Sequence, residues 1–203
     1  MNTYLIPAES VVVTEEIKKS HFITYLEHTD GIAAAKDFIQ TTKCKCPDAR
    51  HHCWAYVAGR PDDCQKLGFS DDGEPTGTAG KPMITQLLAS HIGEITVVVV
   101  RYFGGIKLGT GGLVRAYGNS VQQALNLLST QQKVLQKYYL IHCKYAHIKM
   151  VEKLIQQSAG HILAREYSEN VILEISLPIN VEQKFVDKLR NLSRGALNLV
   201  PKA

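Results

Sequence analysis

The stretch EITVVVVRYF, residues 94–103, constrains the fold more than any other part of the sequence. Its centre is an unbroken apolar run of strand length, which is typical of a strand buried on both faces. A glycine-rich turn, GGIKLGTGG at residues 104–112, leads from this strand into the amphipathic segment LVRAYGNSVQQALNLLST. We therefore expect a buried strand that is joined to a helix by a glycine-rich loop.

The first 93 residues add two strand pairs and two helices to this unit. β-branched and aromatic residues dominate two neighbouring segments, which predicts an N-terminal hairpin. Asp30 precedes a helical pattern whose first N–H groups it can cap, and Pro82 suits a first helical turn because it has no N–H to leave unpaired. The expected elements are strands at 10–17 and 20–27, a helix at 31–42, a polar connection at 43–50, strands at 51–59 and 65–69, and a helix that opens at 81–82.

The pattern of strands and helices restarts after the polar stretch TQQKVLQKY, residues 130–138. The order that follows is strand, helix, strand, strand, helix, strand, which is the plan of the ferredoxin-like fold. We therefore place a boundary within residues 130–137 and expect two α/β (α+β) domains, 1–133 and 134–203. The expected elements of the second are strands at 138–145, 161–168, 170–178 and 195–200 and helices at 146–160 and 181–193.

Length, charge and cysteine content bound the class of protein. The chain has 203 residues and a formal net charge of +4, which permits a polyanionic partner without requiring one. No apolar run approaches the roughly 18 residues of a membrane span, and the N-terminus lacks the pattern of a signal peptide. Five cysteines cannot all pair within one chain, which fits a reducing compartment. We expect a cytoplasmic protein without a membrane partner.

The glycine-rich loop is a candidate anion site. Glycine lets the backbone approach a ligand closely, and a helix that starts near Gly111 directs unpaired N–H groups into the loop. Nearby cations would suit a phosphate or carboxylate. The alternative is that turns and packing alone require the glycines, with the cations paired to nearby carboxylates. The candidate anion-binding residues are Arg101, Gly104, Gly105, Lys107, Gly109, Gly111, Gly112 and Arg115.

A second loop, FSDDGEPTGTAG at residues 69–80, is acidic. Its carboxylates are oxygen donors that could hold a divalent cation or move a proton, or they could pair with the cations of the glycine-rich loop. The candidate acidic-loop residues are Asp71, Asp72, Gly73, Glu74 and Pro75.

Known cofactor fingerprints are absent from both loops. A P-loop ending at Lys81 would need glycine in place of Pro75 and serine or threonine in place of Pro82, and no G-x-G-x-x-G stands in register. ATP hydrolysis and NAD chemistry therefore have no support, and we expect no cofactor.

Cysteines and histidines gather between residues 44 and 64. Their spacing, C-x-C followed by H-H-C, lacks the paired units of a structural zinc site, and His52 and Cys53 would point to opposite faces of a strand. Cys53 with His51 and His52 beside it also offers a nucleophile and a base, but a buried thiol packs as a small hydrophobe and no third orienting residue can be assigned. We therefore expect no metal site and no catalytic residue.

Four segments resemble the signature of the IMPACT family, in its bacterial form. They are GFSDDGEPTGTAGKPM (68–83), VVVVRYFGGIKLGTGGLVRAY (97–117), KSHFI (19–23) and DARHHCWAYVAG (48–59). The resemblance implies an N-terminal domain like those of a ribosomal small-subunit protein and of domain four of elongation factor G. It also implies a ferredoxin-like second domain similar to that factor's domain five. Eukaryotic members regulate translation under stress through a further partner-binding domain that this chain lacks, so that role does not transfer.

For bacterial members the resemblance implies RNA or ribosome binding and no established reaction. We therefore expect a non-enzymatic regulator or accessory factor of translation, in which the two loops share one polar cleft. One alternative is a protein or enzyme that binds a small phosphate-containing ligand at the same loops. The other is a protein-interaction module, with protein partners in translation and no small ligand.

Overall fold

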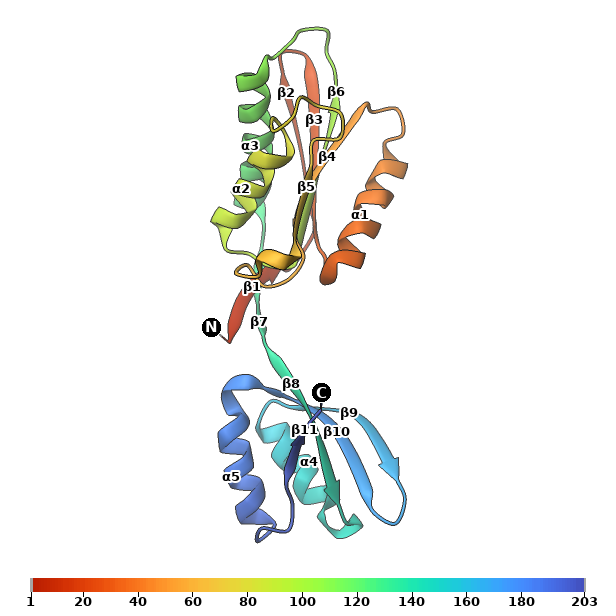
Figure 1. The fold of residues 1–203 in the computed structure, drawn as a ribbon, viewed down its shortest axis with the longest axis vertical. Helices are drawn as coiled ribbons and strands as arrows, with labels where there is room; N and C mark the ends of the chain where they lie inside the picture. Colours follow the sequence, from red (N-terminus) through yellow and green to blue (C-terminus); the bar gives the residue numbers. More distant parts are fainter. Residues whose placement is uncertain (1, 203) are drawn as a thin grey trace. The chain divides into compact units, whose positions relative to one another are not determined.

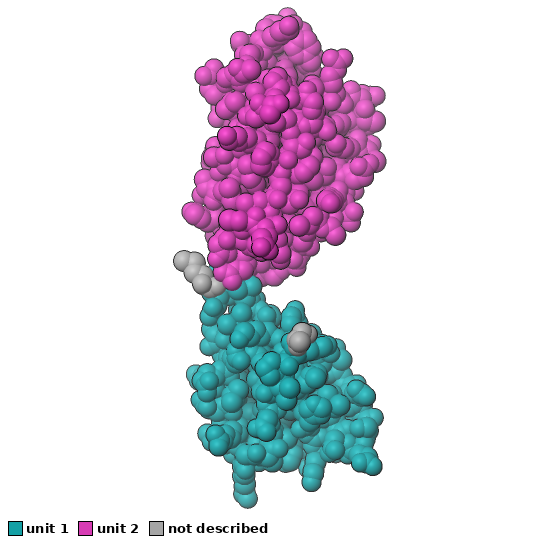
Figure 2. All heavy atoms as spheres, viewed as in Figure 1, with its two compact units in different colours: residues 1–3, 134–203 teal, residues 4–133 magenta. Residues whose placement is uncertain are grey.

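The computed structural model describes residues 2–202, which form two compact units (Figures 1 and 2). The larger unit is Tyr4–Lys133, and the smaller one takes in the chain from Val134 together with the first three residues. Both units combine helices with antiparallel sheets, so the predicted α/β class is confirmed. Within residues 2–202 no helix is both long and apolar enough to cross a membrane.

The larger unit is built on a five-stranded antiparallel sheet of order β2-β3-β6-β4-β5. Helices α2 and α3 cover one face of this sheet and helix α1 covers the other (Figure 1). A 3-10 helix, η1, precedes the edge strand. The bounds are β2 Val11–Ile17, β3 Ser20–His28, α1 Gly31–Lys45, β4 His51–Val57, η1 Cys64–Lys66, β5 Leu67–Ser70, α2 Gly80–Ser90, β6 Ile95–Tyr102 and α3 Thr110–Leu127.

Strand β6 lies at the centre of the sheet, between β3 and β4. Val97 and Val99 pack into the core under α2 and α3, whereas Val98 and Val100 pack into the core under α1. All four side chains are inaccessible to solvent. The prediction of a strand buried on both faces is therefore confirmed, and the alternation of strand side chains explains how one valine run supplies two cores.

Helix α1 begins at Gly31 as predicted, but its N-terminal capping and its C-terminal end differ from the prediction. Asp30 occupies the N-cap position, but its side chain makes no capping hydrogen bond and instead pairs with Lys133 at 3.0 Å. The helix continues to Lys45, so part of the expected connection at 43–50 is helical. The first residue in that stretch that breaks a helix is Pro47, which disfavours helical backbone at the residue before it.

Two short strands, β1 (Thr3–Pro7) and β7 (Thr130–Val134), pair with each other and were not predicted. A buried carboxylate at Glu94 holds them to the body of the larger unit. Tyr4 of β1 and Lys133 of β7 both donate to it, and His28 lies 2.8 Å from its second oxygen. The polar stretch that the sequence presented as a connection is thus partly a strand.

The smaller unit has a four-stranded antiparallel sheet of order β11-β8-β10-β9. Its element order and strand order are those of the predicted ferredoxin-like plan. Helices α4 and α5 pack on one face, where Val151, Leu154 and Phe185 meet the apolar side chains of β8 and β10. The bounds are β8 Gln136–Cys143, η2 Tyr145–His147, α4 Ile148–Gln157, β9 His161–Tyr167, β10 Val171–Pro178, η3 Ile179–Val181, α5 Glu182–Leu192 and β11 Leu199–Pro201.

Candidate functional site

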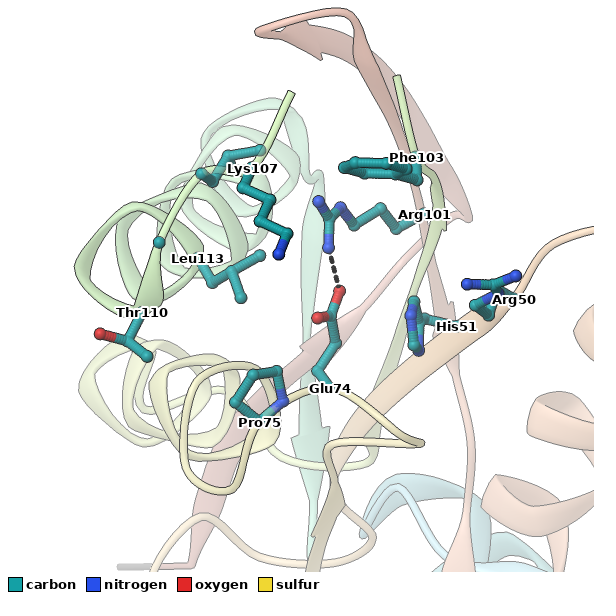
Figure 3. A pocket seen from close by; sticks show the side chains of 11 residues that line it. Arg50, His51, Glu74, Pro75, Arg101, Phe103, Lys107, Thr110 and Leu113 are labelled. Carbon is teal, nitrogen blue, oxygen red and sulfur yellow. Dashed lines mark hydrogen bonds and ion pairs between the residues drawn. The ribbon is translucent and has the colours of Figure 1, made fainter. Parts of the chain in front are cut away.

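The acidic loop and the glycine-rich loop of the larger unit face each other across a cavity of about 380 Å³ (Figure 3). The start of β4, the end of β6 and the first turn of α3 complete its walls. The residues that line it are Arg50, His51, Glu74, Pro75, Arg101, Phe103, Lys107, Leu108, Gly109, Thr110 and Leu113.

A buried ion pair forms one wall of the cavity. Nη1 of Arg101 donates to Oε1 of Glu74 at 2.6 Å, and the two side chains are 7% and 4% exposed. The hydroxyl of Tyr117 donates to the same oxygen at 2.9 Å, and burial raises the pKa of Tyr117 far above its ordinary value. No described residue donates to Oε2 of Glu74. Oε1 of Glu74 thus accepts two hydrogen bonds from the described residues, and Oε2 accepts none.

The guanidinium of Arg101 is held on several sides. It lies 5.5 Å from the ring centre of Phe22 and 5.6 Å from that of Phe103, and Nη2 is 3.5 Å from the hydroxyl of Ser20. Aromatic faces attract cations, so these rings stabilise the charge without accepting hydrogen bonds. Its Nε atom is buried and makes no hydrogen bond. We conclude that Arg101 positions Glu74 and is itself poorly placed to receive a large anion.

Asp71 organises the loop that precedes helix α2. Its Oδ1 accepts from the backbone N–H groups of Ala79 and Gly80 at 2.9 and 2.8 Å, and its Oδ2 accepts from Gly77 at 2.8 Å. Burial alone would raise the pKa of Asp71, but the three N–H donors outweigh it and hold the pKa below its ordinary value. This carboxylate is therefore ionised at neutral pH and committed to the backbone.

Asp72 ties the acidic loop to its neighbours. It pairs with Lys43 of α1 at 2.9 Å and accepts from the backbone N–H of His52 at 2.8 Å. Burial opposes ionisation, but Lys43 and the His52 N–H lower the pKa of Asp72 below its ordinary value. Its backbone is left-handed, with φ of 41°, and Gly73 completes the turn that brings Glu74 to the cavity.

The glycines of the second loop serve different purposes. Gly104 lies so close to the hairpin at Lys19 that a Cβ atom would stand 1.9 Å from that residue's carbonyl oxygen. Gly109 has φ of 77° at the N-cap of α3, where no side chain caps the helix. Gly105 lies in the loop, and Gly111 and Gly112 lie in the first turn of the helix. The free N–H groups of α3 therefore begin at the rim of the cavity.

The three cations of the predicted anion site are dispersed. Lys107 lines the cavity and makes no hydrogen bond or ion pair with any residue from 2 to 202. Arg115 lies instead beside a second hollow of about 450 Å³ between α2 and α3, together with Lys81. Of the three predicted cations, Arg101 is buried in a pair, Lys107 is free at the cavity, and Arg115 is outside it.

Several cavity residues were not singled out from the sequence as anion-site residues. Arg50 is exposed at the rim, and Phe103, 52% exposed, follows directly after the buried strand. His51 lies with Nδ1 3.0 Å from the carbonyl oxygen of Asp72. Because a carbonyl can only accept, Nδ1 carries the proton and Nε2 is the ring atom left for a ligand. The sequence signal for Arg50, His51 and Phe103 was no more than a polar or aromatic residue at one end of a buried strand, β4 or β6.

The cysteines and histidines of the first domain are dispersed as well. Cys53 is fully buried under α3, its thiol donates to the backbone oxygen of Asp71, and burial raises its pKa to about 12. His52 lies on the other face of β4, where it meets the backbone oxygen of Cys46 at 2.9 Å. In the described part of the chain, no three His, Cys, Asp or Glu side chains gather to hold a metal ion. The Cys53 thiol is protonated and is not a nucleophile at neutral pH.

Comparison with known proteins places this architecture in a family. The model of the Impact N-terminal domain matches residues 18–125, and that of the Domain of unknown function (DUF1949) matches residues 141–196. The chain belongs to the IMPACT family. All eleven residues that line the cavity fall within the first match, so the candidate site is a feature of the Impact N-terminal domain in this chain.

Similar IMPACT proteins match over most of their length. The chain is 55% identical to the IMPACT family member YigZ of Escherichia coli K12 over 98% of both chains. It is 50% identical to an IMPACT family member of Haemophilus influenzae, over 97% of this chain and 96% of that protein. A crystal structure of a protein described only as hypothetical shares 54% identity, with a TM-score of 0.82 over 100% of this chain and 98% of that one. The predicted family resemblance is confirmed.

Proposed function

We propose that this IMPACT protein is a non-enzymatic factor that binds RNA at the cavity of its larger unit and acts on translation. One observation carries the proposal: Lys107 lines the cavity without an ion pair to any described residue, while each carboxylate of the acidic loop already has a charged or backbone partner. Asp71 is committed to backbone N–H groups, Asp72 to Lys43, and Glu74 to Arg101. The rim therefore carries uncompensated positive charge, which favours an anion.

The surroundings of Lys107 suit a phosphodiester backbone. The uncapped N-terminus of α3 adds N–H donors and positive partial charge at the same rim. Arg50, exposed on the opposite wall, supplies a second cation. The half-exposed ring of Phe103 offers a surface on which a base can stack. Phosphate contacts beside an aromatic ring are the usual means of binding single-stranded RNA.

The chemistry of the remaining groups favours binding over catalysis. A catalytic site would need a nucleophile or a general base that is free to react. The thiol of Cys53 is buried and protonated, and the carboxylate of Glu74 already accepts from Arg101 and Tyr117.

A second candidate function is the binding of a small phosphate-containing ligand at the same cavity. Its volume of about 380 Å³ lies at the lower end of the range of small-molecule sites. Under this alternative, a mononucleotide should raise the melting temperature of the wild-type protein, and Lys107→Ala should abolish that rise.

The RNA proposal is tested by the anisotropy of a labelled single-stranded RNA, measured from 50 to 200 mM salt. Lys107→Ala should weaken binding and reduce the slope of log affinity against log salt by about 0.7, the value for one phosphate contact on a single strand. Lys36→Ala is the matched control, because Lys36 is exposed on α1, which covers the other face of the sheet.

Salt-independent binding, or equal losses in the two variants, would contradict the assignment of the phosphate to this rim. Cosedimentation with ribosomes across the same salt series asks separately whether the RNA is ribosomal. Arg101→Ala is unsuitable as a probe of anion binding, because it removes the partner of a buried carboxylate.

A further inference from the structure

The carboxylate of Glu74 is only half satisfied within the protein. Its Oε1 accepts from both Arg101 and Tyr117, whereas its Oε2 accepts from no residue between 2 and 202. The residue is 8% exposed, and it lines the cavity. In Figure 3 the side chain reaches into the cavity, and the ammonium group of Lys107 points toward it from the opposite wall.

The free oxygen of Glu74 restricts which chemical group of a ligand can contact it. Glu74 forms an ion pair with Arg101 at 2.6 Å, and the carboxylate of an ion pair can only accept hydrogen bonds. Oε2 is the acceptor that this carboxylate leaves open to the cavity, so a ligand that supplies a hydrogen-bond donor there is favoured. A phosphate oxygen cannot supply it and would be repelled. The group that meets Oε2 must be a neutral hydroxyl or an N–H.

The two sides of the cavity thus favour different chemical groups of a ligand. The side of Lys107 and the N-terminus of α3 favours an anion, and the side of Glu74 favours a hydrogen-bond donor. A ribonucleotide carries both groups close together, as a phosphate and a 2′-hydroxyl on one sugar. A deoxyribonucleotide has only a C–H at that position, so the 2′-hydroxyl is the group by which a protein distinguishes RNA from DNA.

We infer that the cavity receives a single ribonucleotide of an RNA strand, with Glu74 accepting from its 2′-hydroxyl, and that this contact selects RNA over DNA. The inference rests on the proposed function, since it assumes that the strand's phosphate lies at Lys107. Arg101 is a positioning residue here, because it acts by orienting the carboxylate of Glu74. Phe103 bounds the same cavity and provides the stacking surface for the base.

The test compares three labelled oligonucleotides of one sequence by anisotropy: RNA, the 2′-fluoro analogue, and DNA with uracil in place of thymine. The fluorine keeps the size and sugar pucker of RNA but has no hydrogen to donate. Wild-type protein should bind RNA about tenfold or more tightly than either analogue, as expected when a charged acceptor loses its hydrogen-bond donor. This comparison needs no variant, so it stands even if a substitution disturbs the fold.

Glu74→Gln then assigns the preference to one atom. The amide oxygen can still accept from Arg101 and Tyr117, and the amide NH₂ replaces the acceptor that faces the cavity. The preference for RNA should fall by about threefold or more, because the amide NH₂ can donate at most a neutral hydrogen bond to the 2′-hydroxyl oxygen in place of the charge-assisted one, while affinity for DNA stays the same. Asp37→Asn, an equivalent substitution on the exposed side of α1, should leave the preference intact. Lys107→Ala should weaken RNA and DNA equally and preserve their ratio.

The outcomes separate the two proposals. If the wild-type protein binds none of the three oligonucleotides, the proposed function fails and the inference fails with it. If it binds all three equally, or if RNA and the 2′-fluoro analogue bind alike, RNA binding stands and the role of the 2′-hydroxyl is refuted. If Glu74→Gln folds and keeps the full preference, the hydroxyl is recognised elsewhere and the assignment to Glu74 is overturned.

Discussion

Replacing Asp71 with alanine tests how far the larger unit depends on one carboxylate. The side chain accepts from the backbone N–H groups of Gly77, Ala79 and Gly80, and α2 begins at Gly80. Ala79 and Gly80 are buried, so water cannot readily replace the carboxylate there. At a net value of about 1 kcal/mol for each hydrogen bond, Asp71→Ala should reduce the free energy of unfolding by about 3 kcal/mol.

Asp71→Asn provides a graded comparison. Its amide oxygen can keep the two bonds that Oδ1 makes with Ala79 and Gly80, while its NH₂ group must face the N–H of Gly77. One hydrogen bond is lost and two donors are opposed, so the expected loss in the free energy of unfolding is about 1 to 2 kcal/mol. Loss of the full 3 kcal/mol in both variants would show that charge matters more than the individual bonds.

The effect of Asp71→Ala should also depend on pH. The pKa of Asp71 is lower in the folded protein than its ordinary value of 3.8. The stability that ionisation of Asp71 contributes is therefore complete above the unfolded-state pKa and is lost as the pH falls through the folded-state pKa. The gap between wild type and Asp71→Ala should be constant near neutral pH and should shrink below about pH 4.

Urea unfolding followed by tryptophan fluorescence measures these differences. The chain has one tryptophan, Trp54, which lies in β4, so the signal reports on the larger unit alone. A loss below 1 kcal/mol for Asp71→Ala at pH 7, or a gap that does not shrink in acid, would refute the reasoning.

Three further predictions use the same structure. Arg101→Ala should reduce the free energy of unfolding, measured in urea, by about 3 to 5 kcal/mol, because it leaves a buried carboxylate unpaired; a loss under 1 kcal/mol would contradict this. Iodoacetamide at pH 8 should alkylate the exposed thiols of Cys44 and Cys64 in the native protein but not Cys53, whose pKa is about 12; an adduct on Cys53 in mass spectrometry would contradict its burial. Gly111→Ala should raise the melting temperature, corresponding to about 0.5 to 1 kcal/mol, because an added Cβ meets no atom within 4 Å; a lower melting temperature would argue against it.

The predictable parts of the fold are the strands and helices whose buried apolar residues recur in the sequence at regular spacing. The valine run of β6 supplies both cores of the larger unit, and β8, β10, α4 and α5 of the smaller unit each keep one apolar face. Strands β1 and β7 were missed because they are short and form a separate two-stranded sheet, and because β7 buries none of its side chains fully. Without a buried face, the polar sequence of β7 carried no strand period.

The two loops that form the candidate site were predictable from the sequence, but the ion pair between Arg101 and Glu74 was not. The sequence offered Asp71, Asp72 and Glu74 as equivalent partners for Arg101. Which one reaches it depends on a turn with left-handed backbone at Asp72, and such a conformation has little sequence signal outside glycine. The contact of His51 with the cavity was not predictable for a similar reason, because it depends on how the acidic loop folds back over β4.

The position of β6 also sets the order in which the larger unit can be assembled during synthesis. The hairpin of β2 and β3 and the pair of β4 and β5 can each form from neighbouring residues, but the two halves have no direct contact in the sheet. They are joined only when β6 arrives, roughly 45 residues after the end of β4. At the usual rates of translation this takes about 2 to 9 seconds. During that interval β3 and β4 each present an unpaired edge, so chaperone capture of nascent chains should be strongest before β6 has emerged from the ribosome.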